Sequence, residues 1–167
     1  MATRSLVCGL IAALMLAAPA FTAPRFAAQP TAGEIAVSLT RYGARSTVSA
    51  LFDQRRWDYV SDRIGAGDRP YLALAPRLAA GADAGAAEDL PIALAFALPR
   101  NAPAVLTALA PGGGLDAAEV CDAPFIEDTV SDIPAWRRSA AAAVRRVADP
   151  RLAAVKATCL AALESEG

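Results

Sequence analysis

The sequence predicts an all-α fold, either a compact bundle or a short stack of about seven to nine short helices. The first observation behind this is a series of capping residues at intervals of 15 to 18, each just ahead of an alanine- and leucine-rich run: Asp68, Asp83, Asn101, Asp116, Asp132 and Asp149. A side-chain oxygen there accepts hydrogen bonds from the orphaned amides of the first helical turn. The second observation is that apolar residues in these runs repeat with a helical period. The third is a pair of cysteines placed to join two of the helices.

The first twenty residues have the pattern of a secretory signal peptide, which we expect to span residues 1–20. Arg4 precedes an apolar run from Leu6 to Leu16, and Ala18-Pro19-Ala20 offers small residues at the positions that a signal peptidase reads. The run is shorter than the roughly twenty residues that a membrane-spanning helix needs, so we expect no stable membrane insertion after cleavage. Lipidation of Cys8 and an uncleaved signal anchor are the alternatives. The sequence therefore predicts a periplasmic or secreted bacterial-type protein.

Beyond the signal peptide we expect a loose N-terminal arm, residues 21–31, and then a single helical domain, residues 32–167. The arm contains Pro24 and Pro30. The first helices of the domain are expected at Ala32 to Tyr42, Arg45 to Phe52 and Gln54 to Ile64, with Gly43 ending the first and the cluster at residues 65–67 ending the third. Four later helix starts carry a proline in the first turn, where its missing N–H is harmless, at Pro70, Pro103, Pro134 and Pro150.

One segment is ambiguous because its apolar residues alternate. From Leu90 to Leu98, large apolar residues occupy every second position, which is also the pattern of a buried strand. We favour a helix because alanine, a good helix former and a poor strand residue, fills most of the gaps. Pro91 is expected to kink this helix or to start it. A helix that is apolar on nearly every side is expected at the centre of the fold.

The last two helices show a clear inner face. Residues with 3-4-4-3 spacing share one side of a helix from Ile133 to Val147, and Arg138 falls on the opposite, solvated side. In the final helix Leu152, Val155, Cys159 and Leu163 repeat the pattern, which turns Cys159 inward. The short helices and tight turns resemble the rhythm of HEAT-type helical repeats, most of all from Asp68 to Leu109, without a repeat signature at the residue level.

Removal of the signal peptide leaves two cysteines, Cys121 and Cys159, and we expect them to form a disulfide. Exported proteins fold in an oxidising compartment, and the two residues do not have the C-x-x-C spacing of a redox-active pair. On the chain-entropy model, closing this loop contributes about 4 kcal/mol to the free energy of unfolding. Two buried free thiols are the alternative.

Composition excludes several classes of function. The chain has no histidine, so Ser-His and Cys-His nucleophiles and histidine-based zinc sites are impossible. We expect no metal and no cofactor. The net charge of −1 argues against nucleic-acid binding, which needs a clustered positive surface. Trp57, Tyr59 and Tyr71 occur at helical spacing among apolar residues and are expected in the core.

One stretch after Cys121 is a candidate interaction loop. It contains Asp122, Phe125, Glu127 and Asp128, and loops held by a rigid scaffold often carry binding residues. The alternative is that Phe125 and Ile126 plug the core. We therefore predict an exported helical module that binds another protein or a peptide, an immunity-type protein being one version.

The enzymatic alternative is a histidine-free envelope hydrolase that uses a carboxylate pair. Two acids are enough for glycoside hydrolysis. The carboxylates available for such a pair are Glu88, Asp89, Glu127 and Asp128. Ordinary charges at helix starts and in loops explain the same residues, so we favour binding over catalysis.

Overall fold

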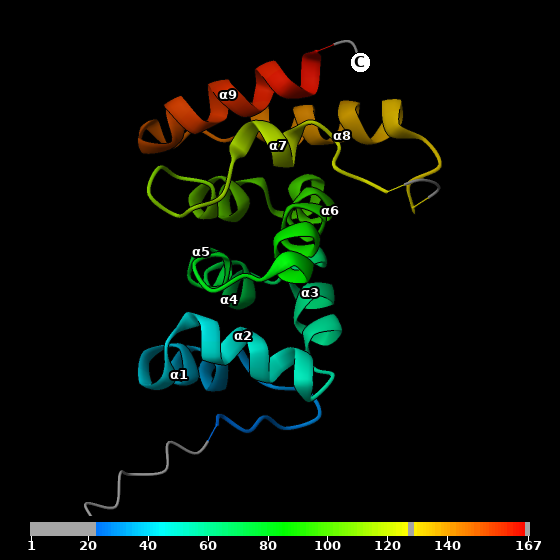
Figure 1. Ribbon diagram of the computed structural model, residues 1–167. Coiled ribbons are helices and arrows are strands. Elements are labelled where there is room, and N and C mark those ends of the chain that lie inside the picture. Colours follow the sequence, from blue (N-terminus) through cyan, green and yellow to red (C-terminus); the bar gives the residue numbers. More distant parts are fainter. Residues whose placement is uncertain (1–22, 127–128, 166–167) are drawn as a thin grey trace, which may run out of the picture.

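The computed structural model describes residues 23–126 and 129–165, and over these residues the protein is all-α, without a strand. Figure 1 shows a stack of helices, with α1 and α2 at one end, α8 and α9 at the other, and α6 between them. The elements are α1 (Ala32–Tyr42), α2 (Ala44–Asp53), α3 (Trp57–Gly65), α4 (Arg69–Leu72), α5 (Ala75–Ala79), α6 (Ala84–Ala108), α7 (Ala117–Cys121), α8 (Ile133–Arg145), the 3₁₀ helix η2 (Pro150–Leu152) and α9 (Ala153–Glu164). The predicted fold class is confirmed. The predicted signal peptide, residues 1–20, lies outside the described residues.

Most of the predicted caps make the expected hydrogen bond. Asp83, Asp116 and Asp132 accept from first-turn amides of α6, α7 and α8, and Asp149 does so for η2. A further cap at Thr31 starts α1, where its hydroxyl and Glu34 form a reciprocal capping box. These short-range bonds set where the helices begin.

Two predicted caps use their side chains for other contacts. Asp68 lies at the N-cap position of α4, but its carboxylate pairs with Arg63 of α3. Asn101 lies inside α6 with a non-helical backbone (φ −149°, ψ 57°), and its amide donates a 2.9 Å hydrogen bond to the Gly67 carbonyl. The predicted kink at Pro91 is therefore at Asn101, with Pro103 in the first turn after the break.

The segment from Leu90 to Leu98 is helical and central, as predicted. It belongs to α6, which packs against α3, α4, α5, α7 and α8. Leu90, Leu94 and Leu98 are almost fully buried. By length and composition α6 is also the one helix among the described residues that could cross a membrane, although 56% of its most apolar window is buried inside the fold.

The described part of the N-terminal arm contains no helix, but hydrogen bonds tie it to the helical body. Gln54 donates to the Pro24 carbonyl (2.8 Å) and accepts from the Phe26 amide (2.9 Å). The Tyr71 hydroxyl donates to the Pro30 carbonyl (2.8 Å). From residue 23 onward the arm is therefore anchored rather than loose.

The third helix begins later than predicted. It starts at Trp57 instead of Gln54, because Arg55 adopts a left-handed conformation (φ 55°) that separates α2 from α3. Gln54 consequently lies in the turn, and this position leaves its side-chain amide available to hold the arm. No local pattern in the sequence signals this role.

Candidate functional site

A concave surface of about 490 Å³ lies between α3 and α6, and we call it the α3–α6 groove. Both helices contribute one side of it. Its lining residues are Ser61, Asp62, Gly65, Ala66, Asp89, Ile92, Ala93, Phe96 and Arg100.

The two helices run in the same direction along the groove. The Trp57 indole N–H donates a 2.7 Å hydrogen bond to Oδ2 of Asp89 near the start of both helices. Further along, Gly65 lies against Phe96, where an added Cβ would come within 3.6 Å of the Phe96 Cβ. The small residue lets α3 and α6 approach closely at this point.

On α6 the groove residues share one face. Asp89, Ile92, Phe96 and Arg100 are spaced three, four and four residues apart, which places them in a row along a helix. Ile92 and Phe96 are half-buried, whereas the residues on the other faces of this segment are buried. The helix is therefore less uniformly enclosed than its apolar sequence predicts. This three-, four- and four-residue spacing is visible in the sequence, and it could have identified these four residues as neighbours on one helix face.

The charges in the groove are separated along its length. Asp89 is half-buried and Asp62 is exposed. Arg100 lies eleven residues after Asp89, about 16 Å along the helix axis at 1.5 Å per residue. It donates hydrogen bonds to the carbonyls of Gly65 (3.1 Å) and Phe96, and so joins α3 to α6 at the far end. On α6, Asp89 thus lies at one end of the groove and Arg100 at the other, with apolar Ile92 and Phe96 between them.

The predicted interaction loop meets the groove through Phe125. Its ring lies 4.8 Å from the ring of Phe96, which lines the groove, and 4.9 Å from that of Trp136 in α8. Phe125 is half-buried by these contacts, whereas Ile126 is 59% exposed. Phe125 therefore packs against the core as the alternative interpretation expected, and Ile126 does not. Glu127 and Asp128 lie outside the described residues.

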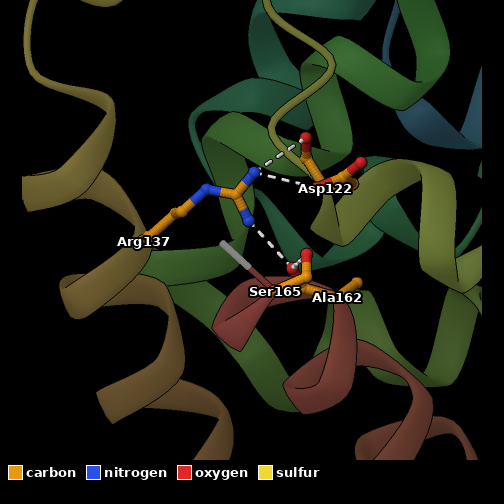
Figure 2. Close-up of polar contacts among 4 residues, drawn as sticks. All are labelled: Asp122, Arg137, Ala162 and Ser165. Carbon is orange, nitrogen blue, oxygen red and sulfur yellow. Dashed lines mark hydrogen bonds and ion pairs between the residues drawn. The ribbon is translucent and has the colours of Figure 1, made fainter. Parts of the chain in front are cut away.

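The beginning of this loop is fixed by two contacts. Cys121 in α7 is bonded to Cys159 in α9, with the sulfurs 2.01 Å apart, so the predicted disulfide is confirmed. Next to it, Arg137 of α8 donates to Oδ1 of Asp122 (2.8 Å) and to the carbonyl of Ala162 (2.8 Å), as Figure 2 shows. Asp122, predicted as an interaction residue, is thus engaged within the protein.

Sequence reasoning missed Arg137. Figure 2 shows its guanidinium between the loop after α7 and the end of α9, where Ser165 also donates to the Ala162 carbonyl (2.7 Å). Its side chain is only 20% exposed. The available signal was its place four residues after Ile133, beside the apolar face of α8.

Of the carboxylates considered for a hydrolytic pair, Glu88 and Asp89 are among the described residues, and these two do not line one groove together. Glu88 is exposed and does not line the groove, and Asp89 lies in the groove with Asp62 instead. Within residues 23–126 and 129–165, no group of three or more His, Cys, Asp or Glu side chains could hold a metal ion.

No protein-family model, no curated protein and no solved structure matches this chain. A functional assignment therefore has to come from the groove and the loop beside it.

Proposed function

We propose that the protein is an exported helical binding module whose α3–α6 groove takes up a peptide or an exposed segment of another protein. The observation that carries the proposal is the composition of the groove. Half-exposed Ile92 and Phe96 form an apolar middle, and charged side chains lie at both ends. Binding sites combine apolar lining with a few oriented polar groups in this way.

The rigidity of the groove supports a binding role. Its walls are two helices joined at one end by Trp57 and Asp89 and at the other by Arg100 and Gly65. The adjacent loop is held by the Cys121–Cys159 disulfide. A preformed surface loses little conformational entropy when it binds a partner, so more of the contact energy contributes to affinity.

Export is part of the proposal and rests on two features. The first is the signal-peptide pattern of residues 1–20. The second is the disulfide, because such bonds persist in oxidising compartments and are rare in reducing ones. The overall charge of −1 favours a protein or peptide as the partner over a nucleic acid.

The binding role can be tested by filling the groove. Ala66 is exposed and lines it, so Ala66→Trp should place an indole across the site without disturbing the core. Ala154, exposed on α9 and remote from the groove lining, provides the matched control Ala154→Trp. The secreted wild-type protein is used to select peptides from a random phage-displayed library, and Kd is measured by fluorescence polarisation.

We expect Ala66→Trp to weaken binding of the selected peptides by about tenfold or more, a loss of about 1.4 kcal/mol, and Ala154→Trp to leave Kd within about twofold. If no peptide is enriched, or if both variants bind as the wild type does, the groove is not a binding site.

A carboxylate-pair hydrolase of the cell envelope is the second candidate, and one observation favours it. Asp62 and Asp89 line the same groove, and glycosidases act with two carboxylates flanking the scissile bond. A peptidoglycan zymogram of the wild type beside Asp62→Asn and Asp89→Asn tests this. Clearing by the wild type that both variants lose would support catalysis, whereas absent or equal clearing removes the hydrolase.

A further inference from the structure

We infer that the α3–α6 groove selects segments in which a lysine or arginine is followed closely by large apolar residues, with the basic side chain at Asp89. This inference rests on the proposed binding function and adds the chemistry of the ligand. Its basis is the half-buried carboxylate of Asp89.

Asp89 has no cationic partner among residues 23–126 and 129–165. Three carboxylates among the described residues are half-buried, namely Asp68, Asp89 and Asp149. Asp68 is paired with Arg63, and Asp149 with Arg151. The hydrogen bond of Asp89 comes from the neutral indole of Trp57, and Asp89 takes part in no ion pair of the described chain. A partly desolvated carboxylate without a counter-charge favours the approach of a cation.

The other charges of the groove do not neutralise Asp89. Asp62 lines the same groove and also takes part in no ion pair of the described chain. Arg100 is about 16 Å away along α6, farther than the Debye length of about 8 Å at physiological ionic strength. Its Nη1 already donates to the carbonyls of Gly65 and Phe96. The Asp89 end of the groove is therefore complementary to a positive charge.

The apolar side chains next to Asp89 define the rest of the ligand. Ile92 lies about one helical turn beyond Asp89, and Phe96 about one turn farther, both half-buried. A lysine or arginine can lay its aliphatic stem on such a surface while its charged group reaches the carboxylate. An extended segment of about five residues covers the distance from Asp89 to Arg100 at about 3.3 Å per residue. Large apolar residues after the basic one would then lie over Ile92 and Phe96.

Four labelled dodecapeptides test this chemistry. Each has flanks of glycine and serine around a central Lys-Ala-Leu-Leu, Glu-Ala-Leu-Leu, Ser-Ala-Leu-Leu or Lys-Ala-Ser-Ser, and binding to the disulfide-bonded secreted protein is measured by fluorescence polarisation. We expect the Lys-Ala-Leu-Leu peptide to bind at least about tenfold more tightly than the Glu-Ala-Leu-Leu peptide. Replacing the leucines with serine should also weaken binding, because the middle of the groove is apolar.

A charge-neutral variant identifies the residue responsible. Asp89→Asn keeps a side-chain oxygen that can accept from the Trp57 indole and removes only the charge. We expect Asp89→Asn to weaken binding of the Lys-Ala-Leu-Leu peptide by about tenfold. The Kd of the Ser-Ala-Leu-Leu peptide should change by no more than about twofold. Asp58→Asn is the control, since Asp58 is exposed on α3 and does not line the groove. In a ¹H–¹⁵N spectrum, the Trp57 indole signal should move as the lysine peptide binds.

Three results overturn the inference. One is equal binding of the lysine and glutamate peptides; another is no effect of Asp89→Asn. The third is failure of all four probes. A different result overturns the proposed function: library-selected peptides that bind Ala66→Trp as tightly as they bind Ala154→Trp.

Discussion

Trp57 and Asp89 connect α3 to α6 at one end of the groove, with the indole N–H 2.7 Å from Oδ2 of the carboxylate. Trp57 is only 1% exposed, so its N–H depends on this acceptor rather than on water. Asp89 therefore combines a structural role, as an acceptor, with a charge that faces the groove. Substitution can separate the two.

We expect Asp89→Leu to lower the free energy of unfolding by about 1–3 kcal/mol, the usual effect of leaving a buried donor unsatisfied. Asp89→Asn retains an acceptor and should change it by less than about 0.5 kcal/mol. Urea denaturation followed by circular dichroism measures both. Equal losses in the two variants would show that the charge, and not the hydrogen bond, stabilises the fold.

Arg137 should be more important for stability than its neighbour Arg138. Arg137→Met removes charge-assisted hydrogen bonds to Asp122 and to the Ala162 carbonyl, with an expected loss of about 1.5–3 kcal/mol. Arg138 is exposed, so Arg138→Met should fall within about 0.5 kcal/mol of the wild type. The two are compared by urea denaturation of the oxidised protein. Similar stabilities would exclude a structural role for the Arg137 contacts.

Gly81 allows the turn after α5 to pack on the start of α2. A Cβ at this position would lie 2.2 Å from the carbonyl carbon of Ala44, an overlap with backbone that no side-chain rotation relieves. Gly81→Ala should therefore lower the melting temperature and cost about 1–3 kcal/mol. Gly33→Ala is the control, since that helical glycine has only Thr31 Oγ1 nearby, at 3.9 Å, and the change should stabilise by about 0.5–1 kcal/mol. A Gly81→Ala protein as stable as the wild type would contradict this packing.

Replacing both Cys121 and Cys159 by alanine should lower the free energy of unfolding by about 4 kcal/mol, because the unfolded chain is no longer closed into a loop. The wild-type protein with its disulfide reduced should lose a similar amount. Mass spectrometry after alkylation under denaturing conditions, without reductant, checks the bond itself. Two alkylated cysteines in the secreted protein would show that it does not form.

Tyr71 makes the free energy of unfolding decrease at alkaline pH. Burial is the main cause that raises the pKa of its phenol to about 12, above the value of 10.0 for an unperturbed tyrosine. Because the folded state favours the protonated phenol, this stabilisation is complete below pH 10 and is lost as the pH rises from 10 to about 12.

Tyr71→Phe removes the titrating group and the hydrogen bond to the Pro30 carbonyl, a loss of about 1 kcal/mol at pH 8. Urea midpoints of the two proteins should converge between pH 10 and about 12. A constant difference over this range would show that Tyr71 does not control the alkaline transition.

Much of the helical organisation could be predicted because its signals are local. Asp83 and Asp132 bond to amides three residues ahead, and Trp136, Ala140 and Val144 turn inward because their spacing places them on one face. The disulfide followed from there being only two cysteines after residue 20. Where a side chain could choose between a local and a distant partner, prediction failed: Asp68 pairs with Arg63, and Asn101 bonds to Gly67.

The sequence alone determined the fold class, most helix starts and the pairing of Cys121 with Cys159, because these depend on bonds within one turn or on a single available combination. Only the tertiary structure decided that Trp57 meets Asp89, 32 residues later, and that Phe125 lies on Phe96. Such contacts depend on which faces of separate helices pack together, and many pairings bury similar apolar area. The spacing of Asp89, Ile92, Phe96 and Arg100 places them in a row on α6, but this row becomes one side of a groove only because α3 packs beside it.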